Sequence, residues 1–146
     1  MCSVDGLTVD LCGPFSLRHS DSFVLTCSGI DGRVGAAQAG VPVARRNCAF
    51  GDSAYSYGQN IRSRTGIPSD KPMNSARECI EWHYGEADQL YPFMCNKMNL
   101  RLGAGVPLKE LYFIRELFRN CYVCLYGNKT SERFQVNPPS LEQYLA

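Results

Sequence analysis

The sequence predicts an α+β fold, in which a single compact domain places a small antiparallel sheet before a helical C-terminal half with one long helix. Three observations predict it. Residues 1–72 are rich in glycine, serine and β-forming residues, whereas residues 75–90 and 107–126 carry apolar side chains at helical spacing. The length of 146 residues is near the commonest size of one domain, and 45% hydrophobic with 20% charged residues is typical of globular proteins.

The N-terminal half is expected to form the sheet. Residues 22–27 are predicted as one strand, because phenylalanine, valine and threonine favour extended backbone. Residues 31–32 are Asp-Gly, which indicates a hairpin turn, since glycine readily adopts the positive φ that such turns require. Residues 35–43 are the expected partner strand, and the glycines and the proline of residues 45–71 predict loops.

The first helix is expected to begin at a capping box. Ser75 and Glu78 have the spacing that lets two side chains satisfy two free backbone donors at a helix start. Apolar or partly apolar side chains then recur at helical spacing, namely Ala76, Cys79, Ile80, His83, Ala87 and Leu90. Pro92 ends this pattern.

The second helix is predicted over residues 107–126. Pro107 suits its first turn, and Gly127 is a common residue just beyond a helix end. One apolar stripe runs along it, formed by Leu108, Leu111, Ile114, Phe118, Cys121 and Leu125. We expect this helix to form the core, with Phe113, Phe118 and Leu125 as anchors. Tyr112, Tyr122 and Tyr126 are expected at its margin, as an apolar strip for self-association.

The C-terminal tail is predicted to lie outside the domain, so that residues 1–132 form the domain and residues 133–146 the tail. Pro138 and Pro139 interrupt the chain there, and a short helix is expected over residues 140–145. We expect this tail to pack on the surface or to contact a partner.

Charge and cysteine content constrain the protein's setting. Fifteen basic and fourteen acidic residues give a net charge of +1, which provides no global field toward nucleic acid or anionic lipid. No apolar run reaches the roughly 18 residues of a membrane span. The first residues lack the pattern of a secretory signal, so the expected setting is a soluble, cytoplasmic protein whose eight cysteines stay reduced.

Cys121 and Cys124 form a CxxC pair, for which packing in the core is the leading interpretation. Together with Cys79 and Glu81, the pair resembles the Cys-x-Glu and Cys-x-x-Cys arrangement of cytidine-deaminase-like enzymes. That resemblance implies a zinc ion held by the three thiolates, with the glutamate moving protons for a zinc-bound hydroxide. Zinc is therefore the one cofactor that the sequence suggests, as an alternative to none.

Cys48 and His83 are candidate catalytic residues. Cys48 follows an asparagine and precedes Ala-Phe, and His83 precedes a tyrosine, an order that resembles papain-like and OTU-type cysteine proteases. The resemblance implies a Cys48 thiolate activated by His83, and Glu86 or Asp88 could orient the imidazole ring. The alternative is a cysteine in a glycine-rich loop and a histidine on a helix face.

A basic and aromatic loop over residues 45–64 is the candidate binding surface. Its members are Arg45, Arg46, Tyr55, Tyr57, Arg62 and Arg64. Arginine pairs with phosphate and exposed aromatic rings stack on unpaired bases, so single-stranded RNA is one candidate partner. A docking surface for an acidic protein and an ordinary solvated loop are the alternatives.

The sequence lacks a glycine-rich phosphate loop, a Gly-x-Ser-x-Gly elbow and a His-Glu-x-x-His motif. These absences argue against nucleotide hydrolases, common serine esterases and zincins. The leading interpretation is a small intracellular accessory or effector-like protein that binds a macromolecule through the 45–64 loop and an apolar helix face. A cysteine hydrolase and a zinc-dependent deaminase-like enzyme remain the enzymatic alternatives.

Overall fold

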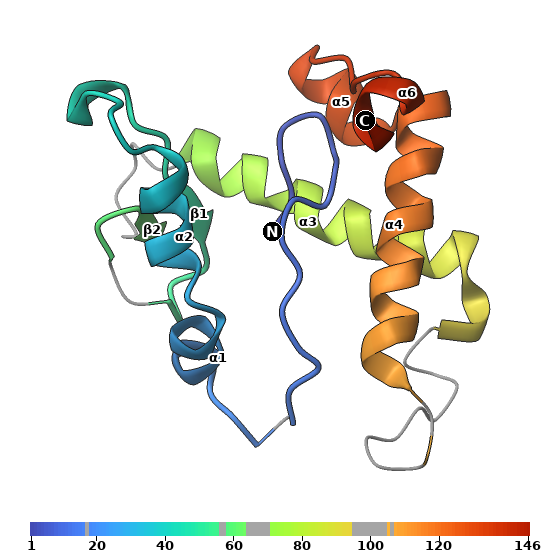
Figure 1. The fold of residues 1–146 in the computed structure, drawn as a ribbon, viewed down its shortest axis with the longest axis horizontal. Helices are drawn as coiled ribbons and strands as arrows, with labels where there is room; N and C mark the ends of the chain where they lie inside the picture. Colours follow the sequence, from blue (N-terminus) through green and yellow to red (C-terminus); the bar gives the residue numbers. More distant parts are fainter. Residues whose placement is uncertain (17, 56–57, 64–70, 95–104, 106) are drawn as a thin grey trace. The chain divides into compact units, whose positions relative to one another are not determined.

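The computed structural model describes residues 1–16, 18–55, 58–63, 71–94, 105 and 107–146, and it describes only the backbone of residues 71, 72, 74 and 75. Over this part of the chain it contains six α-helices and one two-stranded sheet, whose strands are parallel (Figure 1). The predicted α+β fold with an antiparallel sheet is therefore wrong, and the chain is mainly helical.

The chain folds as two compact units. Unit 1 comprises Met1–Pro14 together with Glu78–Ala146, and unit 2 comprises Phe15–Arg77. The helix α3 (Lys71–Leu90) begins in unit 2 and ends in unit 1. The predicted division between a domain and a tail after residue 132 stays a prediction.

Unit 2 begins with a helix where a strand was predicted. α1 (Asp21–Ser28) has Ser20 as its N-cap, and the Ser20 side chain accepts a hydrogen bond from the backbone N–H of Phe23. Gly29 closes the helix in the left-handed conformation, with φ of 61°. Two good caps around eight residues thus override the β-propensity of the residues between them.

The predicted hairpin turn is also helical, because residues 31 and 32 lie inside α2 (Ile30–Ala37). The Asp31 carboxylate accepts a hydrogen bond from the backbone N–H of Asn60 at 2.8 Å. The Asn60 side-chain amide in turn donates to the Asp31 carbonyl at 3.0 Å. Asp31 therefore connects α2 to the chain just before the second strand, rather than closing a turn.

The sheet of unit 2 lies in the stretch predicted as loop. β1 (Ala49–Gly51) pairs in parallel with β2 (Ile61–Ser63), and Phe50 lies opposite Arg62. Ile61 and Ser63 are buried whereas Arg62 is exposed, as the alternation of a strand requires. Each strand has only three residues, which is why no alternating pattern was visible in the sequence.

Both predicted long helices exist, with one shifted start. α3 begins at Lys71, four residues before the predicted capping box, so the backbone of Ser75 is inside the helix and not at its cap. Pro72 occupies the first turn, where a missing N–H costs little. The predicted end before Pro92 is confirmed, and a short 3₁₀ turn η3 (Pro92–Met94) follows.

α4 (Leu108–Tyr126) agrees with its predicted limits. Pro107 precedes it, and the Gly127 N–H donates to the Val123 carbonyl at 2.8 Å to close it. Two short helices follow, α5 (Lys129–Phe134) and α6 (Leu141–Leu145). α6 confirms the short helix that was predicted in the tail, and it packs against α4.

In unit 1, α4 crosses α3, and the N-terminal segment runs beside them (Figure 1). Side-chain hydrogen bonds join all three, as described below. None of the helices in the described part of the chain has both the length and the apolar character needed to cross a membrane.

Candidate functional site

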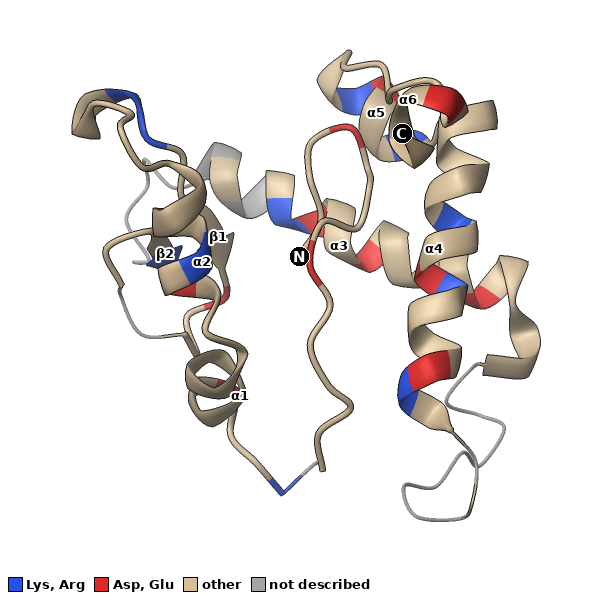
Figure 2. Ribbon diagram, viewed as in Figure 1, with Lys and Arg blue, Asp and Glu red and all other residues tan. Residues whose placement is uncertain are grey.

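Polar side chains fill the space between α3 and α4 in unit 1, and charged residues recur along both helices (Figure 2). The buried members are His83 on α3 and Arg115, Glu116, Arg119 and Asn120 on α4. Arg119 is only 1% exposed, which is rare for an arginine. A charge at such depth is tolerated only with close partners, so each of these groups must find one.

His83 and Glu116 form the centre of this cluster. The His83 Nε2 lies 3.0 Å from a carboxylate oxygen of Glu116. The Thr8 hydroxyl donates to the same oxygen at 2.7 Å. Burial by itself would raise the pKa of Glu116, but the hydrogen bonds from His83 and Thr8, the charge of His83 and the hydrogen bond from Arg115 outweigh it and lower the pKa to about 2.

Two arginines on successive turns of α4 extend the cluster. The Arg115 guanidinium donates to the other Glu116 oxygen at 3.0 Å and to Asp88 at 3.3 Å. Arg119 donates to Glu86 at 2.6 Å and to the Gly6 carbonyl at 2.8 Å. Each buried arginine thus has a carboxylate partner on α3.

Asn120 attaches the N-terminal segment to α4. Its side-chain oxygen accepts from the Thr8 backbone N–H at 2.8 Å, and its amide donates to the Thr8 carbonyl at 2.8 Å. The same amide donates to the Tyr144 hydroxyl of α6 at 2.9 Å. The Asn120 side chain therefore links the N-terminal segment, α4 and α6. Its two hydrogen bonds to Thr8, one accepted and one donated, resemble those that a neighbouring strand would make.

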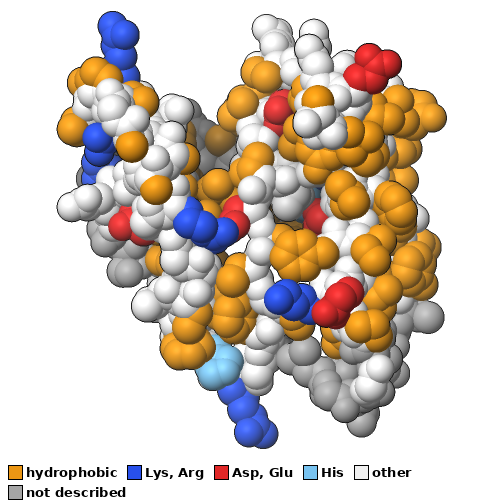
Figure 3. Space-filling view, viewed as in Figure 1, with side chains coloured by type: hydrophobic (Ala, Val, Ile, Leu, Met, Phe, Trp, Pro, Cys, Tyr) orange, Lys and Arg blue, Asp and Glu red, His pale blue; other side chains and the backbone are white. Residues whose placement is uncertain are grey.

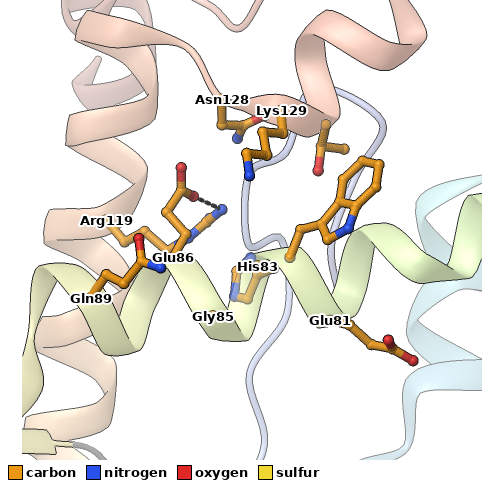
Figure 4. A pocket seen from close by; sticks show the side chains of 10 residues that line it. Glu81, His83, Gly85, Glu86, Gln89, Arg119, Asn128 and Lys129 are labelled. Atoms are coloured by element: carbon orange, nitrogen blue, oxygen red, sulfur yellow. Dashed lines mark hydrogen bonds and ion pairs between the residues drawn. The ribbon is translucent and has the colours of Figure 1, made fainter.

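A pocket of about 280 Å³ opens beside this cluster. Its lining comprises Glu81, Trp82, His83, Gly85, Glu86 and Gln89 of α3, Arg119 of α4, and Asn128, Lys129 and Thr130 at the start of α5. In Figure 4 the Asn128 and Lys129 side chains face the Arg119–Glu86 pair and His83 across the pocket, whereas Glu81 points away. Apart from Trp82 and Gly85, the residues that line the pocket are polar in type.

The opposite face of α4 is apolar and exposed, which corrects the prediction that Phe113, Phe118 and Leu125 anchor the core. Phe118 is 55% and Leu125 57% exposed. The exposed apolar face consists of Phe113, Ile114, Leu117, Phe118, Tyr122, Leu125 and Tyr126. Hydrophobic side chains cover the surface over α4 (Figure 3). The buried residues of this helix are instead Leu108, Val123 and the polar set.

The proposed catalytic pair is divided between the units. Cys48 lies exposed in unit 2, directly before β1, and His83 is buried in unit 1. Glu86 and Asp88, the expected ring-orienting residues, pair with arginines, and Glu116 takes that position. The Cys48–His83 hydrolase stays a prediction.

The deaminase-like residues all belong to unit 1. Cys79 is buried on α3, and Cys121 and Cys124 are half-buried on α4. Within the described residues, no three His, Cys, Asp or Glu side chains form a group that could hold a metal ion, so these three thiols with Glu81 form none. Burial raises the pKa of Cys124, and the charge of Cys121 raises it further. Both effects favour a protonated Cys124 thiol.

The basic and aromatic loop lies in unit 2. Arg45 ends the 3₁₀ turn η1 (Val43–Arg45), and Arg46 and Arg62 are exposed. The Tyr55 ring lies against Gly51, where an added Cβ would come within 2.6 Å of it. Tyr57 and Arg64 fall outside the described residues. The arginines therefore face solvent, while Tyr55 covers β1.

Sequence reasoning missed Glu116, Arg119 and Asn128. A signal for the first two was present, because residues 115, 116, 119 and 120 form a polar stripe at helical spacing opposite the apolar one. Asn128 caps α5 through a capping box with Ser131, whose N–H donates to Asn128 at 2.7 Å. Asn128 directly follows Gly127, which ends α4, and the sequence analysis therefore did not predict that Asn128 also begins α5.

Comparison with known proteins gives no relative from which a function could be carried over. No protein-family model, no curated protein and no solved structure matches the chain.

Proposed function

We propose that this protein is a protein-binding module that self-associates, two copies meeting through the exposed apolar face of α4. One observation carries the proposal. α4 turns its charged side toward α3 and leaves a side of seven large apolar and aromatic residues in solvent. Soluble chains usually bury the apolar side of an amphipathic helix, so an exposed one indicates a contact surface.

The size of this face suits a second copy. At roughly 200 Å² for each fully exposed side chain of this kind, its seven partly exposed residues present on the order of 700 Å². A typical specific interface buries about 800 Å² on each partner. The largest apolar patch of an ordinary monomer covers about 300–600 Å². The face thus approaches the area that a stable dimer needs.

The distribution of charge along α4 also favours contact between this face and the same face of a second copy. Between Phe113 and Tyr126, the charged residues of α4 are Arg115, Glu116 and Arg119, and all three are buried. A two-fold axis through the middle of the face would therefore bring no like charges together. The same lack of exposed charge disfavours a strongly charged partner such as nucleic acid at this face.

The spacing along α4 supports helix-against-helix packing. Ile114, Phe118, Cys121 and Leu125 follow one another at three- and four-residue intervals, which forms a ridge of the kind that fits the groove of a second helix. Phe118, near the middle of the helix, would lie at the centre of such a contact. Central aromatic residues contribute most to binding in interfaces of this kind.

Sedimentation velocity of the full chain over a wide concentration range tests the proposal. We expect a reversible shift from monomer to dimer with rising concentration. Phe118→Ser should weaken the dimer strongly while leaving the circular dichroism spectrum unchanged. Phe93→Ser is the matched control, because Phe93 is similarly exposed, at 60%, but belongs to η3.

Two outcomes would contradict the proposal. A parent chain that stays monomeric at high micromolar concentration rules out self-association through α4. A dimer that Phe118→Ser and Phe93→Ser weaken to the same degree places the contact elsewhere.

A further inference from the structure

Residues 1–10 of unit 1 fold back on themselves as a short hairpin, which we call the N-terminal hairpin. Cys2 and Thr8 face each other across it in an antiparallel bridge, with a backbone hydrogen bond on either side at 2.9 and 3.0 Å. Residues that oppose each other in such a bridge project their side chains to the same face, with Cβ atoms about 4.5–5.5 Å apart. The Cys2 side chain therefore lies next to that of Thr8.

Thr8 brings this face of the hairpin against α3. Its hydroxyl oxygen lies 3.3 Å from the His83 Nε2, and its backbone makes two hydrogen bonds to the Asn120 side chain. Cys79 precedes His83 by one turn of α3, so these two side chains share a face of the helix, with Cβ atoms about 5–6 Å apart. Both are buried, and both belong to unit 1. Cys2 and Cys79 are thus neighbours of the two side chains that meet at this contact.

The electrostatic environment of Cys2 agrees with this placement. Burial raises the pKa of Cys2 to about 11, the charge of Arg119 opposes the rise, and the charge of Cys79 adds to it. Charges act on one another mainly over distances of about 10 Å or less. Arg119 also donates to the Gly6 carbonyl at the tip of the hairpin. Cys2 therefore lies within reach of α4 on one side and of Cys79 on the other.

Bringing the sulfur atoms of Cys2 and Cys79 together disturbs few interactions. The Cys2 thiol donates to the carbonyl of the adjacent Ser3 at 3.4 Å, and a thiol is a weak donor. Cys79 is 5% exposed and packs as a small apolar side chain. Turning the Cys2 side chain toward Cys79 therefore costs little.

A covalent bond at this place would strengthen an attachment that otherwise consists of hydrogen bonds. The Gly6 carbonyl accepts from Arg119, and the Thr8 backbone pairs with Asn120. A bond from Cys2 to α3 would close a loop that spans more than half of the chain. Closing a long loop restricts the unfolded chain and so stabilises the folded one.

We propose that Cys2 and Cys79 form a redox switch, in which oxidation joins the N-terminal hairpin to α3 through a disulfide bond. In the reduced chain the hairpin is held by its hydrogen bonds to α4 and α3, and in the oxidised chain it is also held covalently. The switch uses other residues than the exposed apolar face of α4, and it does not depend on self-association.

The oxidant is an organic disulfide such as oxidised glutathione. Cys2 is half-buried whereas Cys79 is buried, so the Cys2 thiolate attacks first and displaces one glutathione thiolate. The Cys79 thiolate then attacks the Cys2 sulfur of the mixed disulfide and displaces the second. Two protein thiols are thereby oxidised to one disulfide. One glutathione disulfide is reduced to two glutathione thiols, which take up the two protons.

The environment of Cys2 also sets the speed of the reaction. A pKa of about 11 leaves little Cys2 thiolate at neutral pH, and the thiolate is the attacking species. The exchange is therefore slow, and the switch responds to sustained rather than brief oxidation.

Peptide mapping of the full chain tests the proposal. The folded protein is incubated with excess oxidised glutathione, free thiols are blocked with iodoacetamide, and the chain is cleaved after acidic residues. Cleavage after Asp5, Glu78 and Glu81 releases residues 1–5 and 79–81, each with a single cysteine. We expect these two peptides to be joined by a disulfide, with a yield about tenfold or more above that from chain oxidised in urea, because the fold raises the effective concentration of the thiols.

Cys2→Ser is the decisive variant, since a half-buried serine leaves the fold intact but removes the joined peptides. Cys121→Ser is the matched control, because Cys121 is another half-buried cysteine of unit 1 and its loss should leave the joined peptides unchanged. Oxidation should raise the melting temperature of the parent and of Cys121→Ser by about 5–10 °C, and that of Cys2→Ser should not rise.

Three results would overturn the proposal. The first is the absence of joined 1–5 and 79–81 peptides from the folded chain. The second is an equal yield from folded and urea-unfolded chain, which would mean that the fold does not bring the thiols together. The third is an oxidised chain that carries the bond but melts no higher than the reduced one.

Discussion

Glu116 on α4 lies 3.0 Å from His83 on α3, and both side chains are buried. This buried polar pair lies where an apolar contact between two crossing helices is expected. Arg115 and Thr8 satisfy the remaining capacity of the Glu116 carboxylate, so its charge is compensated on both oxygens. The pair therefore links α3, α4 and the N-terminal segment through one carboxylate.

Removing this carboxylate should destabilise the protein strongly. Glu116→Ala leaves the buried His83 without its carboxylate partner and leaves the buried Arg115 with Asp88 alone, and breaking a buried ion pair by removing one partner costs about 3–5 kcal/mol. Glu110→Ala on the same helix is the control, because Glu110 is exposed and should matter by a few tenths of a kcal/mol. Urea unfolding measures both. Equal stabilities of the two variants would contradict the buried cluster.

Acid should weaken the fold through the same group. The pKa of Glu116 is about 2 in the folded chain, against an ordinary value of 4.5, so folding favours its ionised form. The stability that Glu116 contributes is therefore fully present above about pH 4.5 and is lost as the pH falls toward 2. Unfolding free energies across this range should fall less steeply in Glu116→Gln than in the parent. Parallel curves would count against the lowered pKa.

Truncating a side chain should lower the stability of the monomer more on the buried face of α4 than on its exposed face. Val123 is fully buried, so Val123→Ala should cost about 2 kcal/mol for the lost methyl groups and the cavity. Phe118→Ala removes a much larger side chain, but one that is 55% exposed, and should cost less in the monomer. Thermal or urea unfolding at low concentration makes the comparison. A larger loss of stability in Phe118→Ala than in Val123→Ala would instead support the apolar core that the sequence predicted.

Thiol labelling should follow burial. Burial raises the pKa of Cys2 to about 11, despite the opposing charge of Arg119, so Cys2 carries almost no thiolate at neutral pH. The exposed Cys12, Cys27 and Cys48 should react with iodoacetamide before Cys2 and the buried Cys79. Peptide mass spectrometry over time reads out the order. Labelling of Cys2 as fast as that of Cys12 would contradict it.

The same experiment tests the hydrolase alternative. A catalytic Cys48 should react much faster than Cys12 and Cys27, and His83→Ala should remove that advantage. Equal rates for the three exposed thiols would argue against a catalytic Cys48. Denatured protein, in which all eight cysteines are accessible, gives the reference rate.

The sequence by itself determined the helices whose ends carry local signals. Pro107 and Gly127 delimit α4, and Ser140 begins α6 by accepting from the Gln143 N–H. Such caps act within one turn of backbone, so they can be recognised without knowledge of the rest of the chain. The same rules explain α1, where the Ser20 and Gly29 caps prevail over the β-propensity of the residues between them.

Only the tertiary structure decided which side of α4 is buried. An apolar stripe and a polar stripe were both present in the sequence, and burial of the apolar one was the natural expectation. In the structure the polar side is buried instead. Its hydrogen-bond partners come from 33 to 113 residues away in the sequence and are Thr8, Gly6 and His83. A charge can be buried only where such partners meet it, and their meeting depends on the fold of the whole unit rather than on any local pattern.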